Sequence, residues 1–280
     1  VRGLLSILKR RGFETVEASC AADGVTPAAG LAAAIDASTA VVSVMFANNE
    51  TGALQPVAEA AAAARAAGAL SHTDAVQAAG KAKLDVKALG VDLLALSGHK
   101  LNAPKGVGAL YVRRGVRLSP VVTGHQEKNR RGGTENVAAI VGLGVACELA
   151  SRELSGAAAH ALALRRRLEA GVLAIKGATL NGHPDKRLPN TAHFSFADLD
   201  GHHLVVGLDL EGICVSSGPA CSSGASTPSH VLTAMGVPAT LATGSLRVSV
   251  GWGSTDADVD RFLAVLPKIV ARLRAAAVAA

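Results

Sequence analysis

The sequence contains few cysteines, and they are widely separated. Its 280 residues include four cysteines, and no two of them form a C-x-x-C pair. Structural zinc sites are commonly built from such pairs, whereas disulfide frameworks need more cysteine in a shorter chain. We therefore expect neither a metal site nor a disulfide-stabilised secreted domain. Cys20, Cys147 and Cys214 have mainly apolar neighbours in the sequence, so we expect these three to be buried.

The sequence also lacks a long uncharged apolar segment. The most apolar stretch, 57–70, is interrupted by Glu59 and Arg65. A membrane-spanning helix needs about 18 or more apolar residues with few or no charges. The first residues, Val1-Arg2-Gly3-Leu4, do not have the layout of a signal peptide. We expect a cytoplasmic protein that does not bind membranes.

Aromatic residues are scarce, which bears on the excess of positive charge. The formal net charge of +6 would suit a nucleic-acid partner, but there are only five Phe, one Trp and one Tyr for base stacking. The basic pairs Arg113-Arg114 and Arg130-Arg131 are scattered and form no patch in the sequence. We therefore expect no nucleic-acid binding.

Apolar runs alternate with amphipathic helical patterns along the chain, which indicates an α/β fold with a mainly parallel sheet. We expect a large domain over 1–151 and a smaller one over 152–280. The predicted strands of the first part are 41–47, 69–73, 92–97 and 107–112, and a helix is predicted from Pro56 to Ala67. The predicted elements of the second part are helices over 137–154, 156–175 and 256–275 and strands over 191–196, 213–217 and 245–250.

Three polar clusters follow predicted strands of the large domain. They are Asn48-Asn49-Glu50, Asp74-Ala75-Val76-Gln77 and Ser97-Gly98-His99-Lys100. Ligands of open α/β sheets bind at the carboxyl ends of the strands, so these clusters are candidates for one site. Taken singly, each has an ordinary structural explanation, such as a helix cap or a solvated loop.

Together the clusters supply the groups that pyridoxal phosphate requires. Lys100 would form the Schiff base, and Asp74 would face the ring nitrogen and keep it protonated. Ser97 and His99 would bind the phosphate. Gln77 lies three residues after Asp74, which puts it within reach of the phenolic oxygen on a helical turn.

Five segments of the sequence resemble those of the cysteine desulfurases, which are fold-type I pyridoxal-phosphate enzymes with an aspartate-aminotransferase-like large domain and a small α+β domain. The segments span nearly the whole chain in the same order as in that family. They read Val44-Met45-Phe46-Ala47-Asn48-Asn49-Glu50-Thr51-Gly52, His72-Thr73-Asp74-Ala75-Val76-Gln77-Ala78-Ala79-Gly80-Lys81, Ser97-Gly98-His99-Lys100, Arg130-Arg131-Gly132-Gly133-Thr134-Glu135-Asn136 and Ser216-Ser217-Gly218-Pro219-Ala220-Cys221-Ser222-Ser223-Gly224.

The resemblance implies a role for each matching position. Lys100 would hold the cofactor and carry the substrate proton, and Asn49 would lie beside the cofactor and the substrate carboxylate. Arg247 would bind that carboxylate. Thr134 would reach the phosphate of the other subunit in a homodimer.

The resemblance also makes Cys221 the nucleophile. It would take sulfur from L-cysteine, release L-alanine and hold a persulfide for iron–sulfur cluster assembly or another thiolation. The Gly- and Ser-rich segment 216–224 favours an exposed loop, which suits a thiolate that must meet an acceptor protein. Without the other segments, a structural loop would be the simpler interpretation.

The family further implies about 100 residues ahead of Val1, with a Gly/Thr phosphate loop and a histidine that stacks on the cofactor. We expect the chain to lack these features and to be poorly soluble or inactive by itself. Three alternatives stay open: a selenocysteine lyase, a general aminotransferase and an inactive scaffold. The sulfur acceptor is equally open among a cluster scaffold, a tRNA-thiolation enzyme and a DNA-sulfur system.

Overall fold

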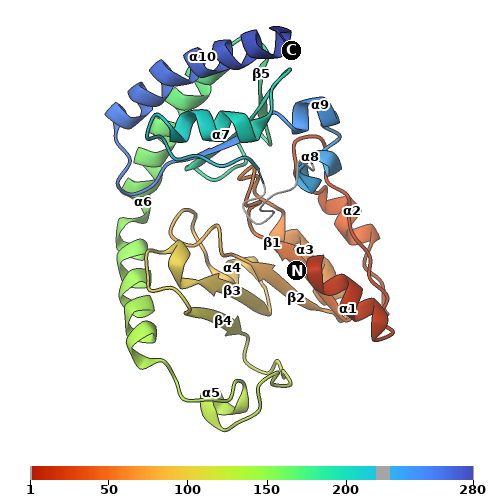
Figure 1. Cartoon of the computed structure of the whole chain (residues 1–280). Helices are drawn as coiled ribbons and strands as arrows, with labels where there is room; N and C mark the ends of the chain where they lie inside the picture. The colour runs from red at the N-terminus through yellow and green to blue at the C-terminus, as the bar shows by residue number, and fades with distance from the viewer. Residues whose placement is uncertain (1, 219–227, 280) are drawn as a thin grey trace. The chain divides into compact units, whose positions relative to one another are not determined.

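A computed structural model describes residues 2–218 and 228–279 (Figure 1). The chain divides into two compact units, which are described separately. The first unit contains residues 1–18, 28–46 and 56–154. The second contains residues 19–27, 47–55 and 155–280.

The first unit is built on a four-stranded sheet in the order β1-β2-β3-β4. β1 is parallel to β2 and β2 is parallel to β3, whereas β4 is antiparallel to β3. The expected α/β fold with a mainly parallel sheet is therefore confirmed in this unit. The bounds of the strands are Val41–Met45 (β1), Leu70–Asp74 (β2), Leu93–Ser97 (β3) and Gly108–Val112 (β4).

Helices connect and cover these strands. α3 (Val57–Ala66) begins after Pro56, as its sequence predicts, and Gly68 follows its end with a φ of +78°. Asp85 caps α4 (Val86–Leu89), because its side chain accepts from the amides of Lys87 and Ala88. The other helical elements are η1 (Arg2–Leu4), α1 (Leu5–Arg10), α2 (Ala28–Ala33), η2 (Gly98–Lys100), the short turn α5 (Gln126–Asn129) and the first half of α6 (Val137–Leu173).

Two apolar clusters form the core of the first unit. Residues of α3, β3 and the segment after β2 make up one cluster, and α6 packs on the turn before α4 in the other. Their buried members are Val57, Ala61, Ala75, Val91 and Leu94 in the first, and Ala79, Leu101, Leu143 and Ala146 in the second.

The second unit has an antiparallel sheet in the order β5-β6-β7, covered by helices. Its central strand, β6, is buried along its whole length. The elements are β5 (Ala178–Asn181), β6 (Thr191–Phe196), α7 (Gly201–Asp209), α8 (His230–Ala234), α9 (Ala239–Ala242), β7 (Ser245–Ser249) and α10 (Asp256–Ala279), with the second half of α6. Phe194, Phe196 and Leu266 are among the fully buried residues of one large core.

Two sequence-based predictions of secondary structure are wrong, and the strand β5 is an element that the sequence analysis missed. Residues 137–173 form one continuous helix, α6, in place of two. The strand expected over 213–217 is reduced to a single bridge between Ser216 and Arg247. β5 was not predicted, because it is four residues long and Gly177 and Gly182 flank it closely.

The described residues include no helix with both the length and the apolar character that a membrane span requires.

Candidate cofactor and substrate site

Asp74 and Lys100 lie at the same edge of the first unit's sheet. Asp74 is the last residue of β2, and β2 pairs in parallel with β3 so that Asp74 lies opposite Ala95. β3 ends at Ser97, and Lys100 ends the 3-10 turn that follows. The acid and the amine therefore follow neighbouring parallel strands at their carboxyl ends, where ligands of such sheets bind.

A tight turn after β2 fixes Asp74 and Gln77. One carboxylate oxygen of Asp74 accepts from the Val76 amide at 3.0 Å. The amides of Ala78 and Ala79 both donate to the carbonyl of Ala75, at 3.0 Å each. Gln77 is half-buried within this turn. Asp74 thus accepts a hydrogen bond within its own turn, in addition to its predicted role at the cofactor ring.

The turn after β3 presents the predicted phosphate ligands. The Ser97 Oγ lies 2.8 Å from the His99 Nδ1, and both His99 and Lys100 are exposed. The Gly98 amide donates to the carbonyl of Val107 at 2.9 Å. A Cβ at Gly98 would lie 2.8 Å from the Val107 Cγ1 and 3.0 Å from the Val107 carbonyl oxygen, so this close approach of the two segments requires glycine.

Lys81 is a residue near this edge to which the sequence analysis gave no role. Burial lowers the pKa of Lys81, and the positive charge of Lys100 lowers it further. The two turns are packed together, since a Cβ at Gly80 would lie 2.8 Å from the Leu101 side chain. The signal available in the sequence was the place of Lys81 in the same segment as Asp74 and Gln77.

His72 is a second such residue. It precedes Asp74 by two positions on β2, and its Nδ1 lies 2.8 Å from the Ser43 Oγ of β1. Burial lowers the pKa of His72, while the carboxylate of Asp74 opposes this shift. His72 therefore belongs to the polar surroundings of Asp74.

Thr134 is exposed in a segment with an unusual backbone. Glu127, Lys128 and Asn129 all have positive φ values, of 48°, 58° and 61°. The Gly132 amide then donates to the carbonyl of Val122 at 2.7 Å. The expected contact of Thr134 concerns the other subunit of a dimer and stays a prediction.

In the second unit, the structure brings Asn49 and Arg247 together. Arg247 is half-buried on β7, opposite His193 of β6. Its Nη1 donates to the backbone carbonyl of Asn49 at 3.0 Å, although the two residues are 198 positions apart. Two of the predicted substrate-binding residues are therefore joined directly.

The loop around Asn49 has further buried contacts. The Asn48 Oδ1 accepts from the amides of Glu50 and Thr51, at 2.9 Å and 3.0 Å. Glu50 is 1% exposed, and its Oε2 accepts from the Ser229 Oγ at 2.5 Å. Ser229 also caps α8, so one hydroxyl serves a helix end and a buried carboxylate.

The predicted nucleophile, Cys221, lies outside the described residues. Of the other cysteines, Cys20 and Cys147 are half-buried and Cys214 is exposed. The expectation that Cys214 is buried is therefore wrong. It follows α7 in a segment that joins the sheet through an isolated bridge at Ser216.

The side chains of the first unit fit pyridoxal phosphate. A lysine, a carboxylate, an amide, a hydroxyl and an imidazole follow two adjacent parallel strands, which is the donor set that this cofactor needs. The contacts of these residues with a cofactor stay predictions.

Comparisons with known proteins give the family. The aminotransferase class-V model matches residues 4–262. A cysteine desulfurase of Gluconacetobacter diazotrophicus is 53% identical over 243 residues, which cover 86% of this chain and 61% of that protein. Cysteine desulfurase 2 of Trichormus variabilis is 48% identical over 270 residues, which cover 96% of this chain and 68% of the relative.

Solved structures agree with the sequence comparison. A NifS-like protein superposes with a TM-score of 0.90 at 36% identity, over 98% of this chain and 72% of the other. The chain thus spans about two thirds of the length of the relatives it matches. These enzymes depend on pyridoxal phosphate and have the fold-type I architecture. With this fold, this ordered set of strand-end residues and these relatives, the chain belongs to the cysteine desulfurases of the aminotransferase class-V family.

Proposed function

We propose that the protein is a pyridoxal-phosphate-dependent cysteine desulfurase, which converts L-cysteine to L-alanine and leaves the sulfur as a persulfide on Cys221. The observation that carries the proposal is the placement of Asp74 and Lys100 after adjacent parallel strands. The relatives named above support it.

The residues of the first unit would hold the cofactor and move the substrate proton. When bound, pyridoxal phosphate supplies an electron sink for the substrate Cα. Asp74 would keep the ring nitrogen protonated, and Gln77 would donate to the phenolic oxygen. Ser97 and His99 would bind the phosphate. Lys100 would attach the cofactor and then carry the Cα proton at its Nζ.

Arg247 and Asn49 would orient the substrate. Because the Nη1 of Arg247 donates to the Asn49 carbonyl, the rest of its planar guanidinium would be available to a carboxylate. The same bond ties the position of Arg247 to that of Asn49.

Cys221 would carry out the sulfur step. Its thiolate attacks the substrate Sγ, so the new S–S bond forms as the Cβ–S bond breaks. The electron pair of the broken bond goes to Cβ, which takes up a proton to complete L-alanine. The persulfide then passes to an acceptor protein, for cluster assembly or another thiolation.

We also propose a homodimer and a cytoplasmic location. Thr134 would bind the cofactor phosphate of the other subunit, since its segment is exposed in the single chain. The substrate is free L-cysteine, which the cytoplasm supplies.

Two substitutions separate cofactor binding from sulfur transfer. Lys100→Ala should abolish the characteristic absorbance of the bound cofactor and all alanine formation, because it removes the attachment amine. Cys221→Ser should keep the absorbance but lose sulfide release in the presence of a thiol, by at least about a hundredfold. Cys214→Ser is the matched control, since Cys214 is an exposed cysteine outside the predicted site.

The same assays decide between the alternatives. Full sulfide release from Cys221→Ser would contradict the assignment of Cys221. Conversion of cysteine to a keto acid would indicate an aminotransferase, and preferential use of selenocysteine in a competition would indicate a lyase for that substrate. Failure of the wild-type chain to bind the cofactor would leave only a scaffold role.

A further inference from the structure

The loop that carries Asn49, residues 49–54, is held at two of its carbonyl groups by guanidinium groups. Arg247 donates to Asn49 O at 3.0 Å. The Nη2 of Arg187 donates to Thr51 O at 2.8 Å, from 136 positions away. The two bonds lie two residues apart on the same short segment, so together they determine how its backbone is placed.

The backbone around Arg187 also pairs with this loop. The Leu54 amide donates to Lys186 O and the Leu188 amide donates to Gly52 O, both at 2.9 Å. The bridge between Ala53 and Arg187 lies between these two bonds. The side chain of Arg187 then reaches past this pairing to the carbonyl of Thr51, next to the residues proposed to contact substrate.

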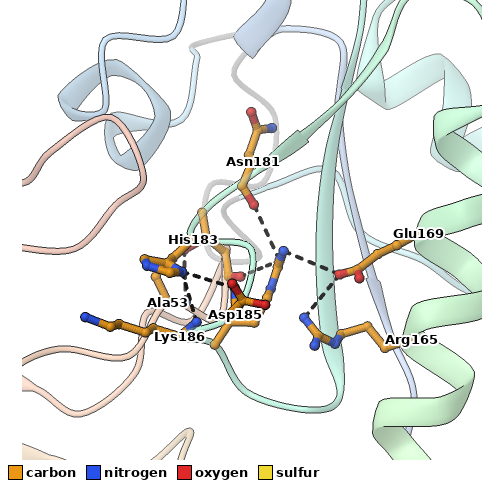
Figure 2. A network of polar contacts seen from close by, with 9 residues as sticks. Ala53, Arg165, Glu169, Asn181, His183, Asp185 and Lys186 are labelled. Carbon is orange, nitrogen blue, oxygen red and sulfur yellow. Dashed lines mark hydrogen bonds and ion pairs between the residues drawn. The ribbon is translucent and has the colours of Figure 1, made fainter.

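Arg187 is buried and stays positively charged. Its side chain is 0% exposed, and its Nη1 lies 3.4 Å from the Glu169 Oε1. Burial lowers the pKa of Arg187 to about 10, while Glu169 opposes the shift, so the group is a cation at neutral pH. Its Nη2 also donates to Asn181 O at 3.4 Å. Asn181 and Glu169, both labelled in Figure 2, are therefore partners of the same guanidinium group.

A second buried arginine shares the same carboxylate but has different partners. Arg165 lies four residues before Glu169 on α6 and pairs with it at 3.1 Å. Figure 2 shows this ion pair as a dashed line. Arg165 is 4% exposed and is therefore about as buried as Arg187. It donates to neither Asn49 O nor Thr51 O. Arg165 therefore provides an internal comparison, with the same chemistry and the same counter-ion.

We propose that Arg187 is a positioning residue for substrate binding, which fixes the Asn49 loop at Thr51 and so fixes the anchor of Arg247 at Asn49. The proposal rests on the proposed function, in which Asn49 and Arg247 meet the substrate. A buried ion pair contributes little net stability on average, because desolvation offsets the attraction. The directional bond from Arg187 to Thr51 O instead fixes the position of the loop backbone, which an apolar replacement would not do.

The test compares Arg187→Lys with Arg165→Lys, in this chain loaded with pyridoxal phosphate. Lysine keeps the charge and most of the volume but lacks the fork that reaches Glu169, Thr51 O and Asn181 O at once. We expect Arg187→Lys to raise the KM for L-cysteine at least about tenfold with kcat within about twofold. Arg165→Lys should leave both constants within about twofold. Equal effects of the two variants, or an unchanged KM in Arg187→Lys, would overturn the proposal.

A second measurement is independent of turnover. Hydrogen exchange of the backbone amides in 49–54 should be faster in Arg187→Lys than in the wild type and in Arg165→Lys. If the wild-type chain forms no alanine, the proposed function fails, and this measurement alone decides whether Arg187 holds the loop. Unchanged exchange in Arg187→Lys would then refute the anchoring itself. Arg187→Met, which removes the charge as well, should speed exchange further, and slower exchange in it would also count against the proposal.

Discussion

At the scale of single residues, His193 shows how the second unit accommodates several buried cations. It is 0% exposed on β6, and its Nδ1 lies 3.0 Å from the Asn181 Nδ2, an amide nitrogen that can only donate. Burial lowers the pKa of His193 from 6.5 to about 3, and the positive charges of Arg247 and Arg187 add to the shift. A neutral imidazole therefore lies near these guanidinium groups without adding a charge.

This shift predicts a pH dependence of stability. Below pH 6.5 the unfolded chain binds a proton at this histidine that the folded chain excludes until about pH 3. The contribution of His193 to the free energy of unfolding is therefore fully present above pH 6.5. It decreases as the pH falls from 6.5 towards 3, by up to about 1.4 kcal/mol per pH unit. Denaturant unfolding of wild type and His193→Gln between pH 4 and 7 should show a shallower dependence in the variant. The exposed His203→Gln is the control, and parallel curves for wild type and His193→Gln would contradict this account.

Single residues also show what the sequence could and could not predict. Asp74, Gln77, Ser97 and Lys100 could be placed together because each follows a predicted strand within a few residues. The bonds from Arg187 to Thr51 and from Ser229 to Glu50 join residues 136 and 179 positions apart. Nothing in the local pattern of the sequence indicates such pairs, since they depend on how distant segments pack.

At the scale of secondary-structure elements, α6 shows tertiary packing overriding a local signal. The boundary between the helices predicted over 137–154 and 156–175 falls at Ser155-Gly156, a pair that favours a break. Yet α6 continues, with Leu143 and Ala146 buried in the first unit and Leu164 and Leu168 buried in the second. The packing of apolar residues on both sides of Gly156 thus stabilises the helix through this unfavourable pair.

Two glycines of α6 predict opposite effects of the same substitution. Gly156 is exposed, and a Cβ there would have nothing within 4 Å, so Gly156→Ala should stabilise the protein by about 1 kcal/mol through helix propensity. A Cβ at Gly171 would lie 2.5 Å from the Leu263 side chain, so Gly171→Ala should destabilise it by about 1–3 kcal/mol. Thermal unfolding measures both. A loss of stability in Gly156→Ala would indicate that the helix is bent or broken there.

At the scale of the whole molecule, the two units have separate apolar cores. Leu94 is buried in the first unit, whereas Phe194 is buried in the second. Segments 19–27 and 47–55 belong to the second unit although they precede most of the first in the sequence. Both segments lie between parts of the first unit in the sequence, so a single boundary along the chain could not assign them to the second unit.

Separate cores predict two unfolding transitions. Leu94→Ala should lower the midpoint temperature of one calorimetric transition, and Phe194→Ala that of the other. Each substitution should reduce the free energy of unfolding of its unit by the roughly 2–5 kcal/mol that removal of a large buried side chain costs. The apo chain is the sample, so that ligand binding does not shift either transition. A single transition lowered equally by both variants would show that the units unfold together.

The antiparallel strand β4 has a consequence for the order in which the molecule forms. Because β4 returns beside β3, residues 98–107 are a hairpin connection, closed by Ser97 opposite Gly108 and by the bond from the Gly98 amide to Val107 O. Lys100 lies inside this short connection, whose closure costs little chain entropy. Arg247 meets Asn49 only after the chain has brought together residues 198 positions apart. During folding, Lys100, which would attach the vitamin-derived cofactor, is therefore expected to reach its position before Arg247, which would bind the substrate amino acid.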